Sequence, residues 1–504
     1  METLNTVRPE LLTLSDAQIG ALMPYLWVFG GAVLATLAAA VKFFKPTWVV
    51  APLFGVAALG GVVSSFFLLR YGYSGVDTLF NGMMATDTYS NFFNLLFLIA
   101  ALITVFSSLR YLDQESLHHP EYYILILFAA LGMMLLASSL DLIVLFIALE
   151  IMSLAIYVLV GFRRNDRRCN EAAMKYFILG AAASGVLLYG TALLYGATGS
   201  TNIRAILSFV QANPAGVTPV YALGAWLVVL GFLFKVAAVP FHMWMPDVYE
   251  GAPVPITGFM TTGLKAAAFA AFLRVFIVTG YGKGIAQVVQ TNIHHILWVS
   301  AVLTMLVGNL VALTQTNLKR MLAYSSIAHT GYLLVGMLAG SQNENGYAPV
   351  VVYLVSYAVM NLGAFVVLTA IASRADGGLN LHDFSGLSRR QPFLAFSMAV
   401  FMFSMAGIPP TAGFAAKYLL FYSAVQAGEV PLVVISVLCS AISVYYYLRV
   451  LVYMYMRDPA EGMVRVRVSV WSTLAVITMV VLTLQIGVLP ERVVLAAKKA
   501  VSSL

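Results

Sequence analysis

The sequence predicts an all-α protein that crosses a membrane about fourteen times. Of its 504 residues, 61% are hydrophobic and only 10% are charged, whereas soluble domains carry roughly 25% charged residues. The apolar residues are gathered in runs of about twenty, the length that a helix needs to cross the hydrocarbon core of a bilayer. A chain of this composition would precipitate in water, so it is predicted to be a polytopic membrane protein.

The apolar runs define the expected membrane segments. Their boundaries are soft by several residues, and only Ser138, Ser139 and Asp141 separate the fourth run from the fifth. In chain order the segments fall at 20–42, 49–70, 90–110, 122–140, 141–162, 172–197, 220–244, 254–280, 292–315, 321–340, 347–373, 392–425, 430–456 and 469–490.

The basic residues predict the orientation of these segments. Of the 28 Lys and Arg residues, fifteen fall in odd-numbered loops, seven in even-numbered loops or termini, and six inside segments. Loops rich in Lys and Arg remain in the cytoplasm, or on the matrix or stromal side of an organelle. The odd-numbered loops are therefore expected to be cytoplasmic, with both termini on the opposite side. The net charge of +7 arises in these loops and does not indicate a nucleic-acid partner.

The loops leave no room for a soluble domain. The longest polar loop, from Ser373 to Gln391, is short, so the chain is not expected to hold a nucleotide, a flavin or an iron–sulfur cluster. The two cysteines, Cys169 and Cys439, are far apart in the sequence and lack the spacing of metal ligands. Neither a disulfide nor a metal site is expected.

Glu150 is expected near the middle of the fifth segment, in a run with no other charge. As a helix from Asp141 to Phe162, this run is about 33 Å long. A carboxylate at that depth costs several kcal/mol unless it is paired, hydrated or neutral. An acid in this position is therefore a candidate functional group.

Three lysines, Lys235, Lys265 and Lys417, lie at similar depth in other segments. A buried lysine can release its proton, because a low dielectric disfavours the ammonium form and a nearby carboxylate favours it again. At about 7 Å and an effective dielectric near 20, that attraction is roughly 2.4 kcal/mol. Arginine could not act in this way because it stays protonated. The pattern favours a proton relay, with a static ion pair between Glu150 and Lys235 as the alternative.

Other titratable residues inside the segments are weaker candidates. His242 and His329 lie in apolar segments, where a histidine more often serves only as a buried polar group. Lys175, Arg274 and Arg449 lie within two turns of segment ends, and they are expected to extend their charged groups to the membrane surface.

The seventh and twelfth segments are interrupted by prolines. Pro240 lacks a backbone donor and clashes with the carbonyl of Val236, and the pair Pro409 and Pro410 is flanked by glycines. Broken helices are tolerated at membrane depth where the freed backbone is buried in protein or faces water. In transporters, paired breaks in corresponding halves indicate an ion site. The alternative is a proline kink without function.

The positions of the breaks predict an internal repeat. Segments four to eight contain one break in their fourth helix, and segments nine to thirteen contain the other in the same place. Five-helix units of opposite topology would bring both breaks to a pseudo-symmetric interface. The match is imperfect, because Lys235 precedes its proline whereas Lys417 follows its prolines. The tenth segment has no carboxylate to mirror Glu150 and offers His329 instead.

Three stretches resemble a known family: residues 235–255, residues 171–180 and residues 406–414. They are similar to the antiporter-like membrane subunits of respiratory complex I, which also resemble subunits of multisubunit sodium/proton antiporters. Within the family, the motifs are most similar to the branch called subunit N of the proton-pumping NADH:quinone oxidoreductase. The resemblance extends from about residue 90 to about residue 457.

The resemblance implies a fold of fourteen helices with two inverted five-helix repeats, in which helices 7 and 12 are discontinuous. The expected divisions are 1–120 for the first three helices, 121–285 and 286–457 for the two repeats, and 458–504 for the last helix.

The resemblance also assigns roles to residues. Glu150 matches the glutamate of the family's fifth helix and Lys235 the lysine of its seventh. Lys265 matches the connecting lysine of the eighth helix. Lys417 matches the ionisable group of the twelfth helix on the exit side, and a lysine there fits the subunit N branch.

The implied function is proton translocation along this Glu/Lys relay, coupled to electron transfer in other subunits. The chain itself would do no redox chemistry and bind no cofactor, whereas FMN, iron–sulfur clusters and quinone are implied in partner subunits. Expected neighbours are a sister antiporter-like subunit, a small membrane subunit and the lipid bilayer of a bacterial inner membrane. Two alternatives remain: a subunit of a multisubunit cation/proton antiporter, and a membrane scaffold with inert lysines.

Overall fold

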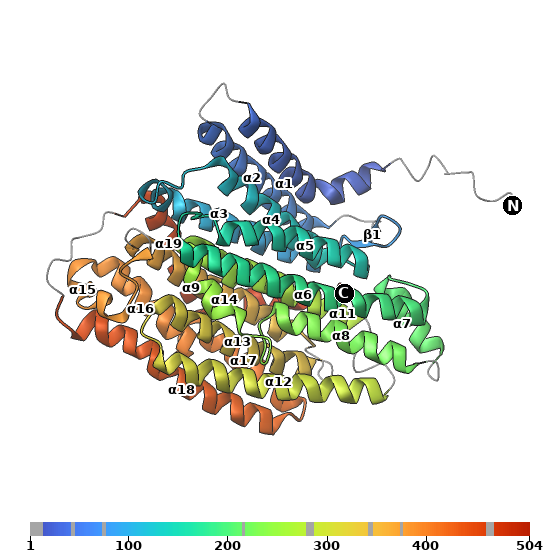
Figure 1. Ribbon diagram of the computed structural model, residues 1–504. Helices are drawn as coiled ribbons and strands as arrows, with labels where there is room; N and C mark the ends of the chain where they lie inside the picture. The colour runs from blue at the N-terminus through green and yellow to red at the C-terminus, as the bar shows by residue number, and fades with distance from the viewer. Residues whose placement is uncertain are drawn as a thin grey trace.

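The computed structural model describes residues 14–41, 46–72, 77–213, 217–278, 287–340, 346–372, 376–459 and 468–504. Most of its helices run side by side in one bundle (Figure 1). In this described part, 12 helices are long and apolar enough to cross a membrane. Two further segments each consist of two shorter helices with a break between them, which completes the fourteen predicted spans. Some of the charged loop residues counted above lie outside the described residues: Arg8, Lys42, Lys45, Lys283, Arg374, Arg465 and Arg467.

The first three helices form an N-terminal unit. Helices α1 and α2 pack as a pair and stand out at one edge of the bundle (Figure 1), and α3 packs against α2. A two-stranded hairpin joins α2 to α3. The elements are α1 (Asp16–Ala40), α2 (Pro46–Tyr71), β1 (Thr78–Leu79), β2 (Met84–Ala85) and α3 (Thr88–Gln114).

The first five-helix repeat begins at Pro120. Its fourth helix is broken into α8 and α9, and its fifth contains one π-helical turn, η3. An additional short helix, α7, precedes the broken one. The elements are α4 (Pro120–Ser138), α5 (Leu142–Val160), α6 (Arg167–Thr198), α7 (Ile203–Ala212), α8 (Pro219–Lys235), α9 (Trp244–Gly251), α10 (Val254–Phe259), η3 (Met260–Leu264) and α11 (Lys265–Val278).

The second repeat has the same order of elements. Its fourth helix is broken into α16 and α17, and short helices again precede the broken one. The elements are α12 (Gln287–Thr314), α13 (Leu318–Gly340), α14 (Ala348–Ile371), η5 (Leu381–Phe384), α15 (Leu387–Arg390), α16 (Pro392–Ala406), α17 (Ala412–Gln426) and α18 (Val430–Met456). Two helices follow it, α19 (Val470–Val488) and α20 (Glu491–Val501).

Backbone hydrogen bonds identify equivalent residues in the two repeats. In the first repeat, the turn between α4 and α5 pairs with the segment after α6. The Leu142 N–H donates to the Thr201 carbonyl (3.0 Å), and the Ile203 N–H donates to the Leu140 carbonyl (2.9 Å). These bonds tie the start of α5 to the start of α7.

The second repeat contains the same pair of bonds. The Leu318 N–H donates to the Leu379 carbonyl (2.9 Å), and the Leu381 N–H donates to the Thr316 carbonyl (2.9 Å). Leu318 is therefore the counterpart of Leu142. Because five helices separate the two turns, they lie at opposite ends of the bundle, as an inverted repeat requires.

Close packing of the first two helices in each repeat gives the same alignment. A methyl group added to Gly132 of α4 would lie 2.5 Å from the Met152 nitrogen of α5. A methyl group added to Gly308 of α12 would lie 2.5 Å from the Ala328 nitrogen of α13. Each glycine thus lets the next helix approach, and Ala328 is the counterpart of Met152.

The two broken helices also share their local geometry. Ala237 and Gly407 both have left-handed backbone angles, with φ of 56° and 87°. The peptide bonds that precede Pro240 and Pro410 are both cis. Lys235, two residues before Ala237, therefore corresponds to a position in α16 rather than to Lys417.

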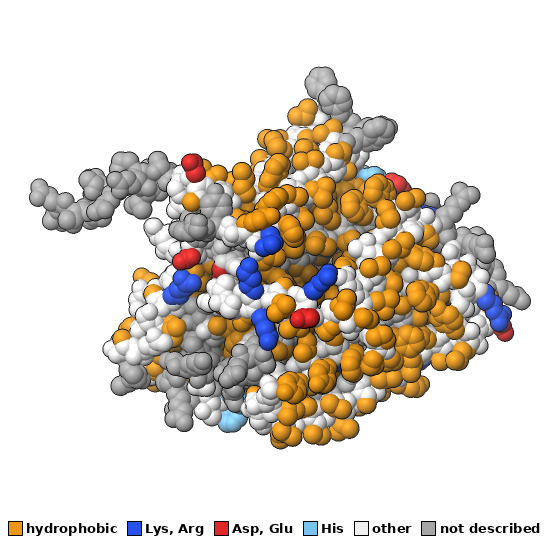
Figure 2. All heavy atoms as spheres, turned by 180° about the vertical axis from the view of Figure 1, so that it is seen from behind, with side chains coloured by type: hydrophobic (Ala, Val, Ile, Leu, Met, Phe, Trp, Pro, Cys, Tyr) orange, Lys and Arg blue, Asp and Glu red, His pale blue; other side chains and the backbone are white. Residues whose placement is uncertain are grey.

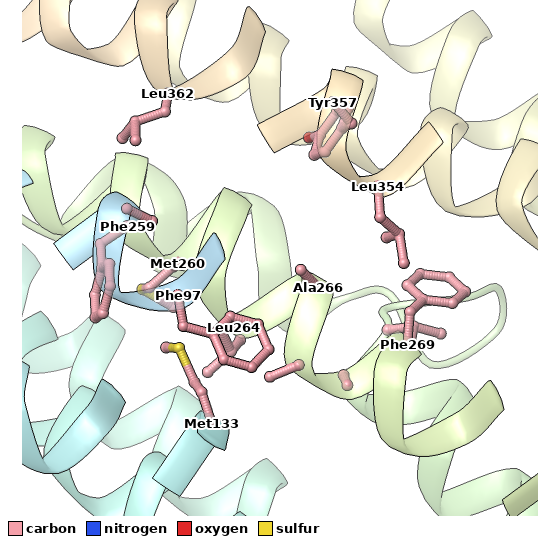
Figure 3. Packing of buried hydrophobic residues seen from close by; sticks show 14 of the residues in the cluster. Phe97, Met133, Phe259, Met260, Leu264, Ala266, Phe269, Leu354, Tyr357 and Leu362 are labelled. Atoms are coloured by element: carbon pink, nitrogen blue, oxygen red, sulfur yellow. The ribbon is translucent and has the colours of Figure 1, made fainter. Parts of the chain in front are cut away.

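The eighth membrane helix, α10 to α11, lies at the centre of the bundle and is buried on every side. Figure 3 shows Phe259, Met260 and Leu264 of this helix packed between Met133 of α4 and Leu362 of α14. Large apolar side chains fill the space around it. This central helix carries Lys265.

The expectation that Arg274 reaches the membrane surface was wrong. Its side chain is 1% exposed and forms two hydrogen bonds with the carboxylate of Asp87, at 2.8 and 3.0 Å. Asp87 caps α3, and burial opposes its negative charge, but the guanidinium of Arg274 more than offsets this effect and lowers the pKa of Asp87. Arg274 therefore remains inside the bundle, although it lies near the end of its helix, because Asp87 at the start of α3 pairs with its charge.

The two other residues of that prediction differ from each other. Arg449 is half-buried, and its guanidinium donates to the carbonyls of Leu313 and Gln315 at the end of α12 (2.8 and 2.5 Å). Lys175 does lie at the surface, where it pairs with carboxylates. The two cysteines are free and buried, as expected.

Candidate functional site

Glu150 and Lys235 lie near each other but do not touch. Lys235 is the last residue of α8 and is 4% exposed. Its Nζ donates a hydrogen bond to the Ser153 hydroxyl (3.1 Å), and Ser153 lies one turn beyond Glu150 on α5. The two charges interact through space, but no contact ion pair joins them in the described part of the chain. One carboxylate oxygen of Glu150 is buried without a protein hydrogen bond.

The break after α8 is held by threonines of the second repeat. The Thr330 hydroxyl donates to the Val236 carbonyl (2.9 Å), and the Val239 N–H donates to the Thr304 hydroxyl (2.9 Å). Backbone groups freed by a broken helix must be satisfied within the protein at this depth. Lys235 is therefore positioned by contacts between the two repeats.

Lys265 begins α11, directly after the π-helical turn, and is 2% exposed. Its Nζ donates to the Ser326 hydroxyl of α13 (2.6 Å) and also to the Ser326 main-chain carbonyl. The ammonium group lies over the ring of Tyr357, 5.2 Å from its centre. This lysine also has no carboxylate partner within the described residues.

The alignment of the repeats identifies the true counterpart of Glu150. Glu150 lies eight residues after Leu142, and Ser326 lies eight residues after Leu318. By the same alignment, His329 corresponds to Ser153, not to Glu150. The carboxylate of the first repeat is thus replaced by a serine in the second, and this serine binds the central lysine.

His329 is enclosed by tyrosines. It is 1% exposed, and its Nδ1 hydrogen-bonds the Tyr353 hydroxyl (2.6 Å) while its Nε2 hydrogen-bonds the Tyr447 hydroxyl (3.2 Å). Both Lys265 and Lys417 lie close enough to interact with it electrostatically. The rings of Tyr357 and Tyr332, over which these two lysines lie, are 4.8 and 5.8 Å from the His329 ring.

Lys417 is 5% exposed and reaches back across its helix break. Its Nζ donates to the carbonyls of Met405 and Ala406, at 3.0 and 3.1 Å, and to the Ser440 hydroxyl at 2.9 Å. These two carbonyls end α16, and the carboxyl end of a helix favours a positive charge. The ring of Tyr332 lies 5.5 Å from the ammonium group.

The position of the charge explains the imperfect spacing in the sequence. Lys235 belongs to the last turn of α8, and the ammonium group of Lys417 lies at the end of α16. Both charges therefore occupy the carboxyl end of the first half-helix, although one lysine precedes its break and the other follows it. Lys417 and Ser440 also line a groove of about 550 Å³ at the protein surface.

His242 is not joined to the other groups. It lies in the break between α8 and α9, half-buried, and its Nδ1 has no hydrogen-bond partner among the described residues. No hydrogen bond in the described residues links it to a candidate lysine. Its role stays a prediction.

Sequence reasoning missed the hydroxyl groups between the charges. Ser153 and Ser440 each bind a lysine, and Tyr353 and Tyr447 bind His329. Such residues are common in membrane helices, so they carry no signal individually. The spacing of Ser153 three residues after Glu150, on the same helix face, was the available clue.

Sequence comparison identifies the family. The family model described as NADH:quinone oxidoreductase/Mrp antiporter matches residues 139–443. The NADH-quinone oxidoreductase subunit N of Trichlorobacter lovleyi is 45% identical over 88% of this chain and 90% of its own length. This chain belongs to that family. The subunit N 1 of Koribacter versatilis, another member, is 41% identical over 96% of this chain and 95% of its own.

Solved structures show the same fold. A chain of respiratory complex I from Thermus thermophilus superposes with a TM-score of 0.78 at 37% identity, covering 94% of this chain and 98% of the other. The Mrp complex of Dietzia sp. DQ12-45-1b gives 0.82 at 19% identity, covering 97% and 98%, and shares the fold alone. The predicted family membership and the fourteen-helix fold with two inverted repeats are confirmed.

Proposed function

We propose that the chain moves protons across the membrane along Glu150, Lys235, Lys265, His329 and Lys417, as one subunit of a proton-translocating NADH:quinone oxidoreductase. The observation that carries this proposal is the state of the three lysines. Each is at most 5% exposed and donates to hydroxyl or carbonyl oxygens, and none has a contact carboxylate in the described residues. A static ion pair, the structural alternative, would need such a contact.

An unpaired buried lysine can change its charge cheaply. In a low dielectric, the ammonium form is costly, whereas a neutral amine still accepts a hydrogen bond from a hydroxyl. Ser153, Ser326 and Ser440 can each turn to donate or accept. The serines therefore accommodate both protonation states of their lysines.

Glu150 supplies the charge that biases the first lysine. Its separation from Lys235 makes the attraction moderate, so a change in its charge or position alters the proton affinity of Lys235 without trapping the proton. The direction of transfer would then follow from events outside this chain.

Partner subunits would supply the driving force. The relatives named above are called NADH-quinone oxidoreductase subunits, which supports redox cofactors (FMN, iron–sulfur clusters and quinone) in neighbouring chains and none in this one. We place the complex in a bacterial inner membrane. The proposed neighbours of this chain in the complex are a sister antiporter-like subunit and a small membrane subunit.

Substitution of Lys235 tests the proposal. Lys235→Ala and Glu150→Ala should leave the complex assembled and able to oxidise NADH, with proton pumping into sealed vesicles impaired. Lys235→Arg should fail equally, because arginine keeps its charge but does not release a proton. Full pumping in Lys235→Arg would contradict a titrating lysine, and wild-type pumping in all three variants would favour the inert scaffold.

A further inference from the structure

A long apolar groove has a lining that includes none of the candidate lysines or their hydroxyl partners. It is formed by α3, α14, α19 and α20 and has a volume of about 310 Å³, which is within the range of small-molecule sites. Representative lining residues are Phe92 of α3, Val359 of α14 and Met479 of α19. From Met479 to Leu489 the groove follows α19 for about 15 Å.

Only two lining residues are polar, and both lie towards one end. Gln485 is on the last turn of α19, and Arg492 is in the first turn of α20. Both side chains are exposed, and neither has a side-chain hydrogen bond or ion pair within the described residues. The adjacent Glu491 is not part of the lining. The groove thus combines a hydrocarbon-like trough with one unmatched positive charge at its mouth.

An exposed guanidinium at the membrane boundary favours an anionic partner. It binds phosphate with two parallel hydrogen bonds. Figure 2, which views the bundle from behind, shows Lys and Arg side chains gathered on a largely hydrophobic face. A neighbouring apolar helix would satisfy the trough but leave Arg492 unmatched.

We propose that this groove binds an anionic glycerophospholipid. Its phosphate lies against Arg492, its glycerol ester region lies beside Gln485, and one acyl chain lies in the trough along α19. The loop charges predict that this end faces away from the cytoplasm, so the lipid belongs to the outer leaflet. The site is separate from the proton path and does not depend on it.

The test uses the whole purified complex in phosphatidylcholine nanodiscs. The probe is phosphatidylglycerol with a photoactivatable group in one acyl chain, and the crosslinked peptides are mapped after digestion. We expect adducts on the peptides of α3, α14 and α19. Unlabelled phosphatidylglycerol should compete, whereas inorganic phosphate should not.

Variants distinguish the contribution of the Arg492 charge to lipid binding from that of the apolar groove. Arg492→Gln should reduce labelling about tenfold or more, because a charge-assisted contact is lost, and Arg492→Lys should retain part of it. Ala496→Phe, which fills the lined space, should reduce labelling with Arg492 intact. Arg204→Gln, which removes another exposed arginine outside the groove, is the matched control and should label normally.

Three results would overturn the proposal. Unchanged labelling in Arg492→Gln would remove the role of the charge. Equal labelling by a phosphatidylcholine probe with the same photoactivatable acyl chain would exclude selectivity for an anionic lipid. Adducts on a neighbouring subunit in place of this chain would mean that a protein partner covers the groove.

Discussion

Lys265 and Ser326 show how a single side chain sets the state of a buried charge. Ser326 occupies the position that holds Glu150 in the first repeat, and its hydroxyl lies 2.6 Å from the Lys265 ammonium. A serine stabilises this charge by hydrogen bonding alone. A carboxylate at the same place would form a contact ion pair worth roughly 5 kcal/mol at an effective dielectric near 20.

Substitutions of Ser326 by Asp and Asn should therefore distinguish the effect of a negative charge beside Lys265 from the effect of a larger side chain. Ser326→Asp should hold the proton on Lys265 and abolish pumping while NADH oxidation and assembly continue. Ser326→Asn introduces a side chain that is similar in size to aspartate but neutral, and this variant should pump at an intermediate rate. The measurement is acidification of sealed vesicles per NADH oxidised. Wild-type pumping in Ser326→Asp would show that the proton on Lys265 does not need to move.

Asp376, in the segment between α14 and η5, joins a buried lysine and a partly buried arginine. Its carboxylate lies 3.0 Å from the Lys319 ammonium and 3.1 Å from the Arg163 guanidinium. Burial opposes the charge of Asp376, but Lys319 and Arg163 offset this cost and lower its pKa. Because Arg163 belongs to the first repeat and Lys319 to the second, this carboxylate connects the ends of both.

Removal of this carboxylate should destabilise the fold in a pH-dependent way. A carboxyl with a lowered pKa in the folded state contributes stability that is complete above its unfolded pKa and disappears as the pH falls through the folded pKa. Asp376→Asn should therefore cost about 3–5 kcal/mol at neutral pH, and the difference from wild type should shrink below roughly pH 4.

The thermal inactivation midpoint of the complex, measured from neutral to acid pH, checks this prediction. The control is Asp458→Asn, which removes the ion-pair partner of Arg389. The Arg389 side chain is 68% exposed and the Asp458 side chain 85%, so this variant should leave the midpoint unchanged. A constant difference between Asp376→Asn and wild type across the whole pH range would contradict the assigned pKa direction.

At the scale of elements, the broken helices are fixed by contacts between repeats. The backbone groups freed near Val236 and Val239 bind Thr330 of α13 and Thr304 of α12. The break in the first repeat is thus completed by helices of the second. Proline explains why the helix stops, and the threonines explain why the break keeps one conformation.

Removal of one threonine hydroxyl should loosen the break without changing a charge. Thr304→Val leaves the buried Val239 N–H without an acceptor, at a cost of about 1–3 kcal/mol. We expect a lower inactivation midpoint and faster hydrogen exchange at residues 236–243. Thr314→Val, near the end of the same helix, removes an exposed hydroxyl bond and serves as the control. Equal exchange rates in the two variants would mean that the break is held by other contacts.

At the scale of the whole molecule, the candidate groups are distributed over both repeats. Lys235 belongs to the first repeat, His329 and Lys417 belong to the second, and Lys265 lies on the central helix that contacts both. These polar groups come from segments that are far apart in the sequence. The first repeat alone would leave Lys265 without Ser326, whereas Lys235 and Lys417 each bind groups of their own repeat.

The choice between a redox-coupled pump and an antiporter also belongs to this scale. An affinity-tagged chain purified from its native membrane should bring with it NADH-dependent quinone reduction, because the proposed driving force lies in partner subunits. The measurement is NADH oxidation by the purified complex, with quinone as the acceptor. Purification of the chain with cation/proton exchange activity and without quinone reduction would favour the antiporter.

Much of this architecture follows from the sequence alone. Apolar runs predicted the spans, interior prolines predicted the two breaks, and isolated charges identified Glu150, Lys235, Lys265 and Lys417 as candidates. These signals are clear because polar groups are so costly in hydrocarbon that a charged residue within an apolar run is easily recognised. The proposed repeat boundaries at 121–285 and 286–457 stay a prediction at the level of single residues.

Tertiary structure decided which groups face each other. Neither the pairing of Lys265 with Ser326, nor the return of Lys417 to the end of α16, nor the burial of Arg274 against Asp87 could be predicted from spacing. A hydroxyl or a helix-end carbonyl becomes a lysine's partner only when packing brings distant segments together. The sequence determined where charge is placed in the membrane, and the packing of distant helices determined what stabilises it there.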